Sequence, residues 1–224
     1  MAELSVIVPV YNEETMIAGV IKKIIDIPID KEIIVVDDGS SDGTGKILRA
    51  ISYPNVKIIH HGTNRGKGAA VLTGLSHASG EYLIVQDADF EYDPHDYMKL
   101  LEQAKLGKGD IILGARFMKG YFGMAIPKIG NRLLTGLVNI LFGVRLNDCF
   151  TCYKLMRRTS ILDLGLVSGS FDIEIEILAK AIKKKLRIVE VPVTYQPRTY
   201  SQGKKIRIRD GLWAVVRIFK FRFN

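Results

Sequence analysis

The chain has 224 residues, of which 47% are hydrophobic, and it carries a formal net charge of +8. This length and composition can form one substantial hydrophobic core, so we expect a folded unit rather than a disordered chain. Met1–Ser5 lacks the basic start of a secretory signal, and the late apolar run Leu133–Val144 falls short of the roughly 20 residues that cross a bilayer. We therefore expect a cytoplasmic protein that is soluble or bound to a membrane surface.

Strand and helix patterns alternate along the first half of the chain. Short apolar runs typical of buried strands lie at Leu4–Val10, Glu32–Val36, Val56–Ile59, Tyr82–Val85 and Asp110–Leu113. Between them apolar residues recur with the 3.6-residue period of a helix, the first such helix following Asn12 as its predicted N-cap. This order predicts an α/β fold with a mainly parallel sheet flanked by helices, whose ligands bind at the carboxyl ends of the strands.

The alternation stops after Arg116. Residues 119–147 have the pattern of an inserted amphipathic segment, and beyond it we expect a strand at Tyr153–Met156, a helix at Ile173–Lys184 and a strand at Leu186–Val191. No internal repeat and no low-complexity linker is visible in the sequence.

The C-terminal stretch predicts an amphipathic helix with one apolar face, formed by Ile208, Leu212, Val215, Val216, Phe219 and Phe223. From Arg198 onward there are eight basic residues and one acid, so this stretch carries seven of the eight net positive charges. A localised basic surface indicates an anionic partner, either phosphates or lipid headgroups. Two interpretations remain open: the helix lies in a membrane interface, or it packs on the core with a solvated basic face.

The most informative segment follows the predicted strand Tyr82–Val85 and contains Asp87, Asp89 and Glu91. Three carboxylates at the end of a buried strand indicate a bound cation, and Mg²⁺ or Mn²⁺ typically uses one or two carboxylates together with substrate phosphates. A solvated acidic turn is the alternative. The segment therefore predicts the metal-binding half of a nucleoside-diphosphate site.

Polar clusters also follow the other predicted strands. Tyr11 and Glu13 lie beyond the first strand, and Asp38 lies beyond the second, where an aromatic ring and acceptors suit a nucleobase. Arg65–Gly68 opens a helix with two glycines and two cations, so its backbone N–H groups and Lys67 are expected to face a phosphate. The spacing is not that of a Walker A loop.

Four motifs occur in order along the chain: Val6–Glu13, Val36–Ser40, Arg65–Gly68 and Asp87–Asp89. Together they resemble the signature of family 2 glycosyltransferases with the GT-A fold. Within that family the chain is most similar to the group of dolichyl- and polyprenyl-phosphate mannose synthases and dolichyl-phosphate glucosyltransferases. The resemblance covers nearly the whole chain. It implies a GT-A (Rossmann-like) domain at residues 1–205, followed by a basic amphipathic helix at residues 206–224.

The resemblance also implies roles for individual residues. The base and ribose would be surrounded by Pro9, Tyr11, Glu13, Val36 and Asp38, and the rest of the nucleotide sugar would contact Lys67, Asp87 and Ala88. Asp89 and Glu91 would hold Mg²⁺ or Mn²⁺. The donor's phosphates would be bound by Arg116, Arg198 and Lys204, which with Asp89 form the catalytic set. The acceptor phosphate would contact Arg116, Arg132 and Arg198, with Lys204 as a further candidate.

Two cysteines form a Cys-x-x-Cys spacing at Cys149 and Cys152. No second pair completes a zinc site and no redox-motif context surrounds them, so we expect two small buried residues. They lie in Asp148–Lys154, which resembles the family's Asp-x-x-Ser-Gly-Phe-Arg element with Cys152 in place of the glycine.

The resemblance thus implies an inverting, metal-dependent glycosyltransferase that moves a hexose, most simply mannose from GDP-mannose, to a polyprenyl or dolichyl phosphate. A lipid phosphate is largely ionised at neutral pH and can attack without the general base that a sugar hydroxyl needs. A UDP-sugar-dependent transferase to a lipid phosphate or glycan is the alternative, and a basic nucleic-acid-binding protein is the alternative from another class. We expect no nucleic acid partner, and a peripheral location on the cytoplasmic face of a membrane.

Overall fold

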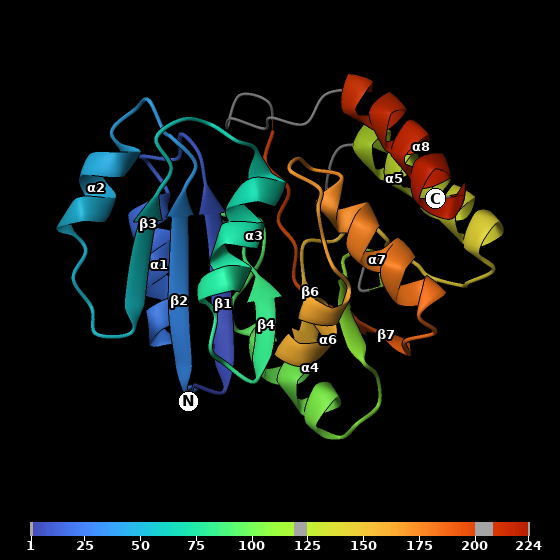
Figure 1. Ribbon diagram of the computed structural model, residues 1–224, viewed down its shortest axis with the longest axis horizontal. Coiled ribbons are helices and arrows are strands. Elements are labelled where there is room, and N and C mark those ends of the chain that lie inside the picture. Colours follow the sequence, from blue (N-terminus) through green and yellow to red (C-terminus); the bar gives the residue numbers. More distant parts are fainter. Residues whose placement is uncertain (1, 119–124, 200–207, 224) are drawn as a thin grey trace.

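The chain folds into one sheet with helices on both faces, as the computed structural model in Figure 1 shows. Residues 2–118, 125–199 and 208–223 are described by the structure. Within them the sheet has seven strands in the order β3-β2-β1-β4-β6-β5-β7. The strands are β1 Leu4–Val10, β2 Lys31–Asp37, β3 Val56–His60, β4 Tyr82–Val85, β5 Ile111–Ala115, β6 Lys154–Arg157 and β7 Ile188–Pro192.

The described strand pairs are parallel except for those of β6, which runs antiparallel to both β4 and β5. In the register Leu4 of β1 lies opposite Lys31 of β2 and Tyr82 of β4. The carboxyl ends of these three strands therefore finish at one edge of the sheet. The predicted α/β class with a mainly parallel sheet is confirmed, whereas the antiparallel direction of β6 was not predicted.

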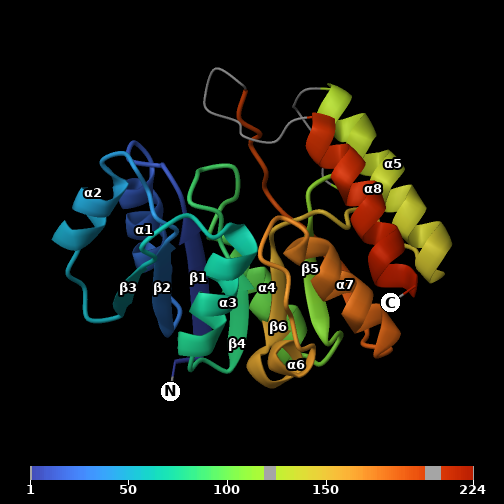
Figure 2. The ribbon, with the colours of Figure 1, turned by 45° about the horizontal axis from the view of Figure 1, so that its top comes forward.

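The helices are α1 Ile17–Asp26, α2 Thr44–Ala50, α3 Lys67–His77, α4 Asp96–Lys105, α5 Ala125–Phe142, α6 Arg158–Asp163, α7 Ile173–Lys183 and α8 Ile208–Phe223. Figures 1 and 2 show α1 and α4 on one face of the sheet and α3 and α7 on the other. Because both faces are covered, the central strands are mostly apolar, and every residue of β1 is buried.

Asn12 does not cap α1, contrary to the prediction. The N-cap is Met16, which makes no side-chain cap bond. Asn12 has a φ of 52°, a left-handed conformation that asparagine tolerates better than most residues, and its Oδ1 accepts a hydrogen bond from the Ser41 N–H at 2.8 Å. This hydrogen bond joins the loop after β1 to the loop after β2. The Asn12 side chain makes this long-range contact instead of capping the first turn of α1.

The C-terminal helix packs on the protein, but through a different face from the one predicted. Figures 1 and 2 show α8 beside α5, and Ile218 is fully buried, with Ala214 and Phe221 against the core. Two polar contacts fix its rotation: Arg217 pairs with Asp172 at 3.3 Å, and Arg222 Nε donates to the Leu141 carbonyl at 2.6 Å. The helix is thus anchored to both α5 and the start of α7.

Four residues of the predicted apolar stripe of α8, Leu212, Val216, Phe219 and Phe223, are exposed as a result, whereas Val215 is half-buried. Leu212 is 69% exposed and Phe223 is 73% exposed, and α5 also presents large apolar side chains to solvent. We call these residues the α5–α8 apolar surface: Ile129, Leu133, Ile140, Leu212, Trp213, Val216, Phe219 and Phe223. Within the described ranges neither helix, nor any other, is long and apolar enough to span a bilayer.

Candidate active site

Predicted site residues from three strands meet at the carboxyl edge of the sheet, the edge to which β2 points in Figure 1. Asp89 follows β4, Glu13 follows β1 and Arg198 follows β7. Arg198 Nη2 lies 2.5 Å from Asp89 Oδ2, and its Nη1 lies 3.2 Å from Glu13 Oε2. Residues as distant in sequence as Glu13 and Arg198 are therefore held together by one guanidinium.

Glu91 is fixed beside this cluster. The Tyr195 hydroxyl donates to Glu91 Oε2 at 2.6 Å, and the backbone N–H of Arg198 donates to Oε1 at 2.7 Å. The Arg198 Nε atom lies 3.9 Å from the same Oε1. The loop after β7 thus orients the Glu91 carboxylate through one hydroxyl and one peptide group, and it also supplies a cation.

The negative charge of Asp89 is unfavourable in its surroundings. Burial and the nearby charges of Asp87 and Glu91 raise the pKa of Asp89 to about 7, and Arg198 offsets part of that rise. Among the described residues no three His, Cys, Asp or Glu side chains are arranged to hold a metal by themselves. Mg²⁺ and Mn²⁺ commonly take one or two protein carboxylates and complete their coordination with phosphates. Asp89 and Glu91 therefore fit such an ion in company with a diphosphate.

A second ion-pair cluster surrounds Asp87, the first carboxylate after β4. Lys67 Nζ, at the start of α3, is 2.7 Å from Asp87 Oδ1 and 3.0 Å from Glu174 Oε1. Glu174 also pairs with Lys154 at 2.5 Å. Burial alone lowers the pKa of Lys67, but the nearby Asp87, Cys152 and Glu174 raise it well above its ordinary value.

The same contacts keep Asp87 ionised. Burial alone raises the pKa of Asp87, yet Lys67 lowers it overall. Lys67 was predicted to face a phosphate directly, but its side chain is 13% exposed and its ammonium is held between two carboxylates. Its predicted contact with the nucleotide sugar stays a prediction, as do those of Asp87 and the buried Ala88.

Sequence reasoning missed Glu174. This residue is one of two glutamates in the otherwise apolar stretch Ile173–Leu178, and both are buried. The other, Glu176, accepts the N–H of Ser168 at 2.8 Å and so holds the loop before α7. Two acids inside an apolar helical run are a signal of buried ion pairs, but the sequence does not name their distant partners.

The residues predicted to surround the base lie in or after β1 and β2, and the loop after β3 bonds to one of them, Asp38. Asp38 accepts the N–H groups of Arg65 and Gly66 at 3.0 and 2.7 Å, and its Oδ1 lies 2.7 Å from His61 Nδ1. Gly66 has a φ of 95°, and a Cβ there would lie 2.4 Å from the Gly169 carbonyl oxygen, so the turn requires glycine. Asp38 thus organises the turn before Lys67.

The remaining residues predicted around the base lie at the same edge. Pro9 and Val36 are buried, whereas Tyr11 is 38% exposed. Aromatic rings of this kind can stack on a nucleobase. The contacts of Pro9, Tyr11, Glu13, Val36 and Asp38 with a base stay predictions.

Arg116 is committed to a protein carboxylate. Its Nε and Nη2 donate to the two oxygens of Asp148 at 2.7 and 2.8 Å, and its guanidinium lies 5.0 Å from the ring centre of Tyr195. Bidentate pairing fixes the plane of the guanidinium. The predicted role of Arg116 on a phosphate stays a prediction, and any such contact would be made by an arginine already oriented by Asp148.

The other predicted phosphate ligands are less defined. Arg132 is exposed on α5, and its role on the acceptor phosphate stays a prediction. Lys204 and the predicted domain boundary at residue 205 lie outside the described residues. Cys149 and Cys152 are free and buried, as predicted. Cys152 Sγ lies 3.4 Å from the Val85 carbonyl oxygen and 3.8 Å from Lys67 Nζ, so the residue in the glycine position borders the second ion-pair cluster.

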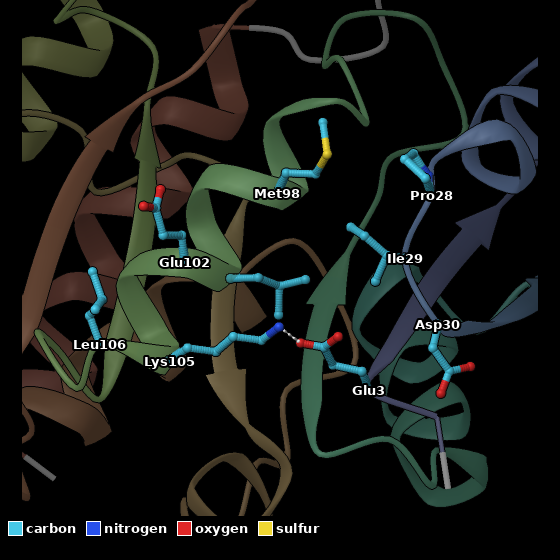
Figure 3. Close-up of a pocket in the computed structure, with 9 residues that line it drawn as sticks. Glu3, Pro28, Ile29, Asp30, Met98, Glu102, Lys105 and Leu106 are labelled. Atoms are coloured by element: carbon cyan, nitrogen blue, oxygen red, sulfur yellow. Dashed lines mark ion pairs between the residues drawn. The ribbon is translucent and has the colours of Figure 1, made fainter.

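A cavity of about 400 Å³ lies away from all of these residues, between α4 and the loop before β2. Figure 3 shows Ile29 and Met98 on its walls and the ion pair between Lys105 and Glu3 at its base. Glu3 precedes β1, so this cavity is at the amino end of the strands. It is therefore separate from the candidate active site.

Comparison with known proteins gives a consistent result. Residues 5–165 match the family described as "Glycosyl transferase family 2". Glycosyltransferase AglJ of Haloferax volcanii is 30% identical over 210 residues, which are 92% of this chain and 67% of that protein. Dolichol-phosphate mannosyltransferase of Pyrococcus furiosus is 31% identical over 213 residues, 90% of this chain and 59% of that protein.

A third relative is the undecaprenyl-phosphate 4-deoxy-4-formamido-L-arabinose transferase of Edwardsiella ictaluri, 29% identical over 208 residues, 90% of this chain and 62% of that protein. The chain therefore spans about two thirds or less of the length of these relatives. Among solved structures, glucosyl-3-phosphoglycerate synthase of Mycobacterium tuberculosis with Mn²⁺, UDP and phosphoglyceric acid has a TM-score of 0.77 at 18% identity, covering 99% of this chain and 78% of that one. This likeness confirms the predicted GT-A fold.

The buried ion pairs of Glu174 generate a stability prediction. Glu174→Gln removes the carboxylate shared by Lys67 and Lys154, so two buried ammonium groups lose a charged partner. We expect the free energy of unfolding to fall by about 3–5 kcal/mol, measured by urea denaturation followed by circular dichroism. The control is Glu81→Gln, which removes an exposed pair with Arg157 and is expected to cost under about 1 kcal/mol. An equal fall in the free energy of unfolding in the two variants would contradict the conclusion that Glu174 stabilises the fold through buried ion pairs.

Proposed function

The chain belongs to glycosyl transferase family 2, and we propose that it transfers a hexose from a nucleotide sugar to a polyprenyl phosphate with inversion at the anomeric carbon. The observation that carries the proposal is the convergence of Glu13, Asp89 and Glu91 on one cation at the carboxyl edge of the sheet. That arrangement supplies carboxylates for a divalent ion and a guanidinium for phosphates in the same place. The names of the relatives support the class of acceptor.

On the donor side, we assign Asp89 and Glu91 as the residues that would hold Mg²⁺ or Mn²⁺. A bound divalent ion would neutralise the charge that develops on the departing diphosphate. Structural relatives solved with Mn²⁺ and UDP support a divalent requirement for the fold's chemistry. Tyr195 and the Arg198 peptide keep the Glu91 carboxylate in place for this role. GDP-mannose is our preferred donor, with a UDP-sugar as the second candidate.

To use a lipid phosphate as acceptor, the protein needs cations that bind the phosphate and needs no general base to deprotonate it. A polyprenyl phosphate is largely ionised near neutral pH, by analogy with phosphoryl groups whose second pKa is about 6. Its oxygen can therefore attack the anomeric carbon directly, opposite the leaving diphosphate. Arg116, Arg132, Arg198 and Lys204 are the proposed ligands of the donor and acceptor phosphates, and Arg116 is held ready by Asp148.

The α5–α8 apolar surface supports binding at a membrane surface. Large apolar side chains are exposed on two neighbouring helices, and on α8 they are accompanied by Trp213, Lys220 and Arg222. An amphipathic helix of this composition inserts its apolar face among lipid headgroups while its cations contact anionic lipid. A protein whose acceptor is a lipid would thereby meet its substrate. The proposed location of the protein is therefore the cytoplasmic face of a membrane, to which it would bind peripherally.

Product analysis tests the transferase assignment. We expect the protein, incubated with Mn²⁺, GDP-mannose or a panel of GDP- and UDP-sugars, and a short polyprenyl phosphate, to form a glycosylated lipid phosphate detectable by mass spectrometry. Asp89→Asn is expected to lower the rate by about 10²–10³-fold because leaving-group stabilisation is lost. The control Asp93→Asn alters a half-exposed neighbouring carboxylate and should retain activity. Release of free sugar alone with every donor would contradict the lipid-phosphate acceptor.

Vesicle flotation tests the membrane assignment. Deleting α8 would also remove the buried Ile218, so we choose the substitutions Leu212→Ser and Val216→Ser, which alter only exposed positions. The double variant is expected to lose at least about tenfold in affinity for vesicles containing phosphatidylglycerol, because less apolar surface is buried in the interface. Met98→Ser, exposed on α4, is the matched control. If wild type and double variant float equally, the surface does not bind lipid.

A further inference from the structure

Arg198 occupies an unusual position for a phosphate ligand. Its guanidinium contacts the carboxylates of Asp89, Glu13 and Glu91, at 2.5, 3.2 and 3.9 Å, and its side chain is only 14% exposed. Two of these carboxylates are the ones assigned to the divalent ion. A protein cation therefore lies where the ion is expected.

The guanidinium and the ion compete for the same oxygens. Mg²⁺ binds carboxylate oxygens at about 2.0–2.1 Å. With Arg198 Nη2 at 2.5 Å from Asp89 Oδ2, an ion on that oxygen would lie within roughly 4–5 Å of a second positive charge, where like charges in a poorly hydrated site repel strongly. Binding of the ion to Asp89 therefore favours departure of the guanidinium.

The hydrogen bonding of the Arg198 side chain is also incomplete. Its Nε atom is buried and makes no hydrogen bond, although two terminal nitrogens are paired. A buried donor without an acceptor destabilises this arrangement. The loop itself is held by other contacts, since the Arg198 peptide N–H and the Tyr195 hydroxyl both donate to Glu91. The side chain can therefore leave while the loop stays attached.

We infer that Arg198 is an internal counter-ion, which fills the cation site in the nucleotide-free protein and moves to the diphosphate when the metal–nucleotide complex binds. The inference rests on the proposed metal site. A diphosphate is a suitable destination because guanidinium groups bind phosphates through paired hydrogen bonds. Metal and nucleotide would then each strengthen the binding of the other, as linkage requires, and the free protein would bind divalent ions weakly.

The test is a titration with Mn²⁺ followed by the electron paramagnetic resonance signal of the free ion, with and without GDP or UDP. Arg198→Gln is expected to bind Mn²⁺ at least about tenfold more tightly than wild type without nucleotide, because the competing cation is gone. Arg198→Lys keeps one charge but lacks the fork, so an intermediate affinity is expected. Arg187→Gln, which removes an exposed pair with Asp110, is the matched control and should bind as wild type does.

Loss of the Arg198 guanidinium removes a positive charge from three buried carboxylates, so thermal melting checks that each variant is folded. If Arg198→Gln does not fold, the comparison is made with Arg198→Lys. If a folded variant binds Mn²⁺ no more tightly than wild type without nucleotide, while wild type binds it with nucleotide, the counter-ion role is wrong and the metal site stands. If wild type binds no Mn²⁺ even with nucleotide, both the inference and the proposed metal site are wrong.

Discussion

The structure depends on how the negative charge after β4 is compensated. Asp87, Asp89 and Glu91 crowd a poorly hydrated edge of the sheet, and a buried carboxylate without a partner is strongly destabilising. Each side of the segment receives its own cation: Lys67 from the start of α3 pairs with Asp87, and Arg198 from the loop after β7 pairs with Asp89. The first pair is enclosed by Glu174, whereas the second faces the edge where a nucleotide sugar is proposed to bind. The Lys67–Asp87 pair is fixed and shapes the site. In the Arg198–Asp89 pair, we propose that the divalent ion replaces the guanidinium.

The fold explains why these partners come from such distant parts of the chain. Parallel strands bring every loop that follows them to one edge, so the loops after β1, β4 and β7 meet there. The antiparallel strand β6 begins at Lys154, which lies opposite Leu113 of β5 and pairs with Glu174. Asp148, in the segment before β6, pairs with Arg116. The apolar surface of α5 and α8 is carried by the part of the chain that packs outside α7, which keeps the proposed lipid contact separate from the sheet.

Much of this arrangement was predictable from local patterns, because buried strands are short apolar runs bounded by polar residues. The bounds of β1 and β4 were predicted as observed, and the acidic segment after β4 was correctly placed at a strand end. Contacts between distant residues were not predictable. Asn12 bonds to Ser41 rather than capping α1, and Glu174 finds its partners only in the fold. On α8 the periodicity identified an apolar stripe but not which face packs inward, since Ala214, Ile218 and Phe221 form the packed face.

The central claim is that the carboxylates after β4 require a cation, which Arg198 supplies until a metal and a diphosphate replace it. A crystal structure of the wild-type protein grown with Mn²⁺ and GDP or UDP tests this most directly through the anomalous signal of manganese. The account predicts a manganese peak bonded to Asp89 and Glu91, with the Arg198 guanidinium on the diphosphate and more than about 3.5 Å from Asp89, beyond hydrogen-bonding distance. Bound nucleotide with no manganese at these carboxylates, and Arg198 still paired with Asp89, would contradict it.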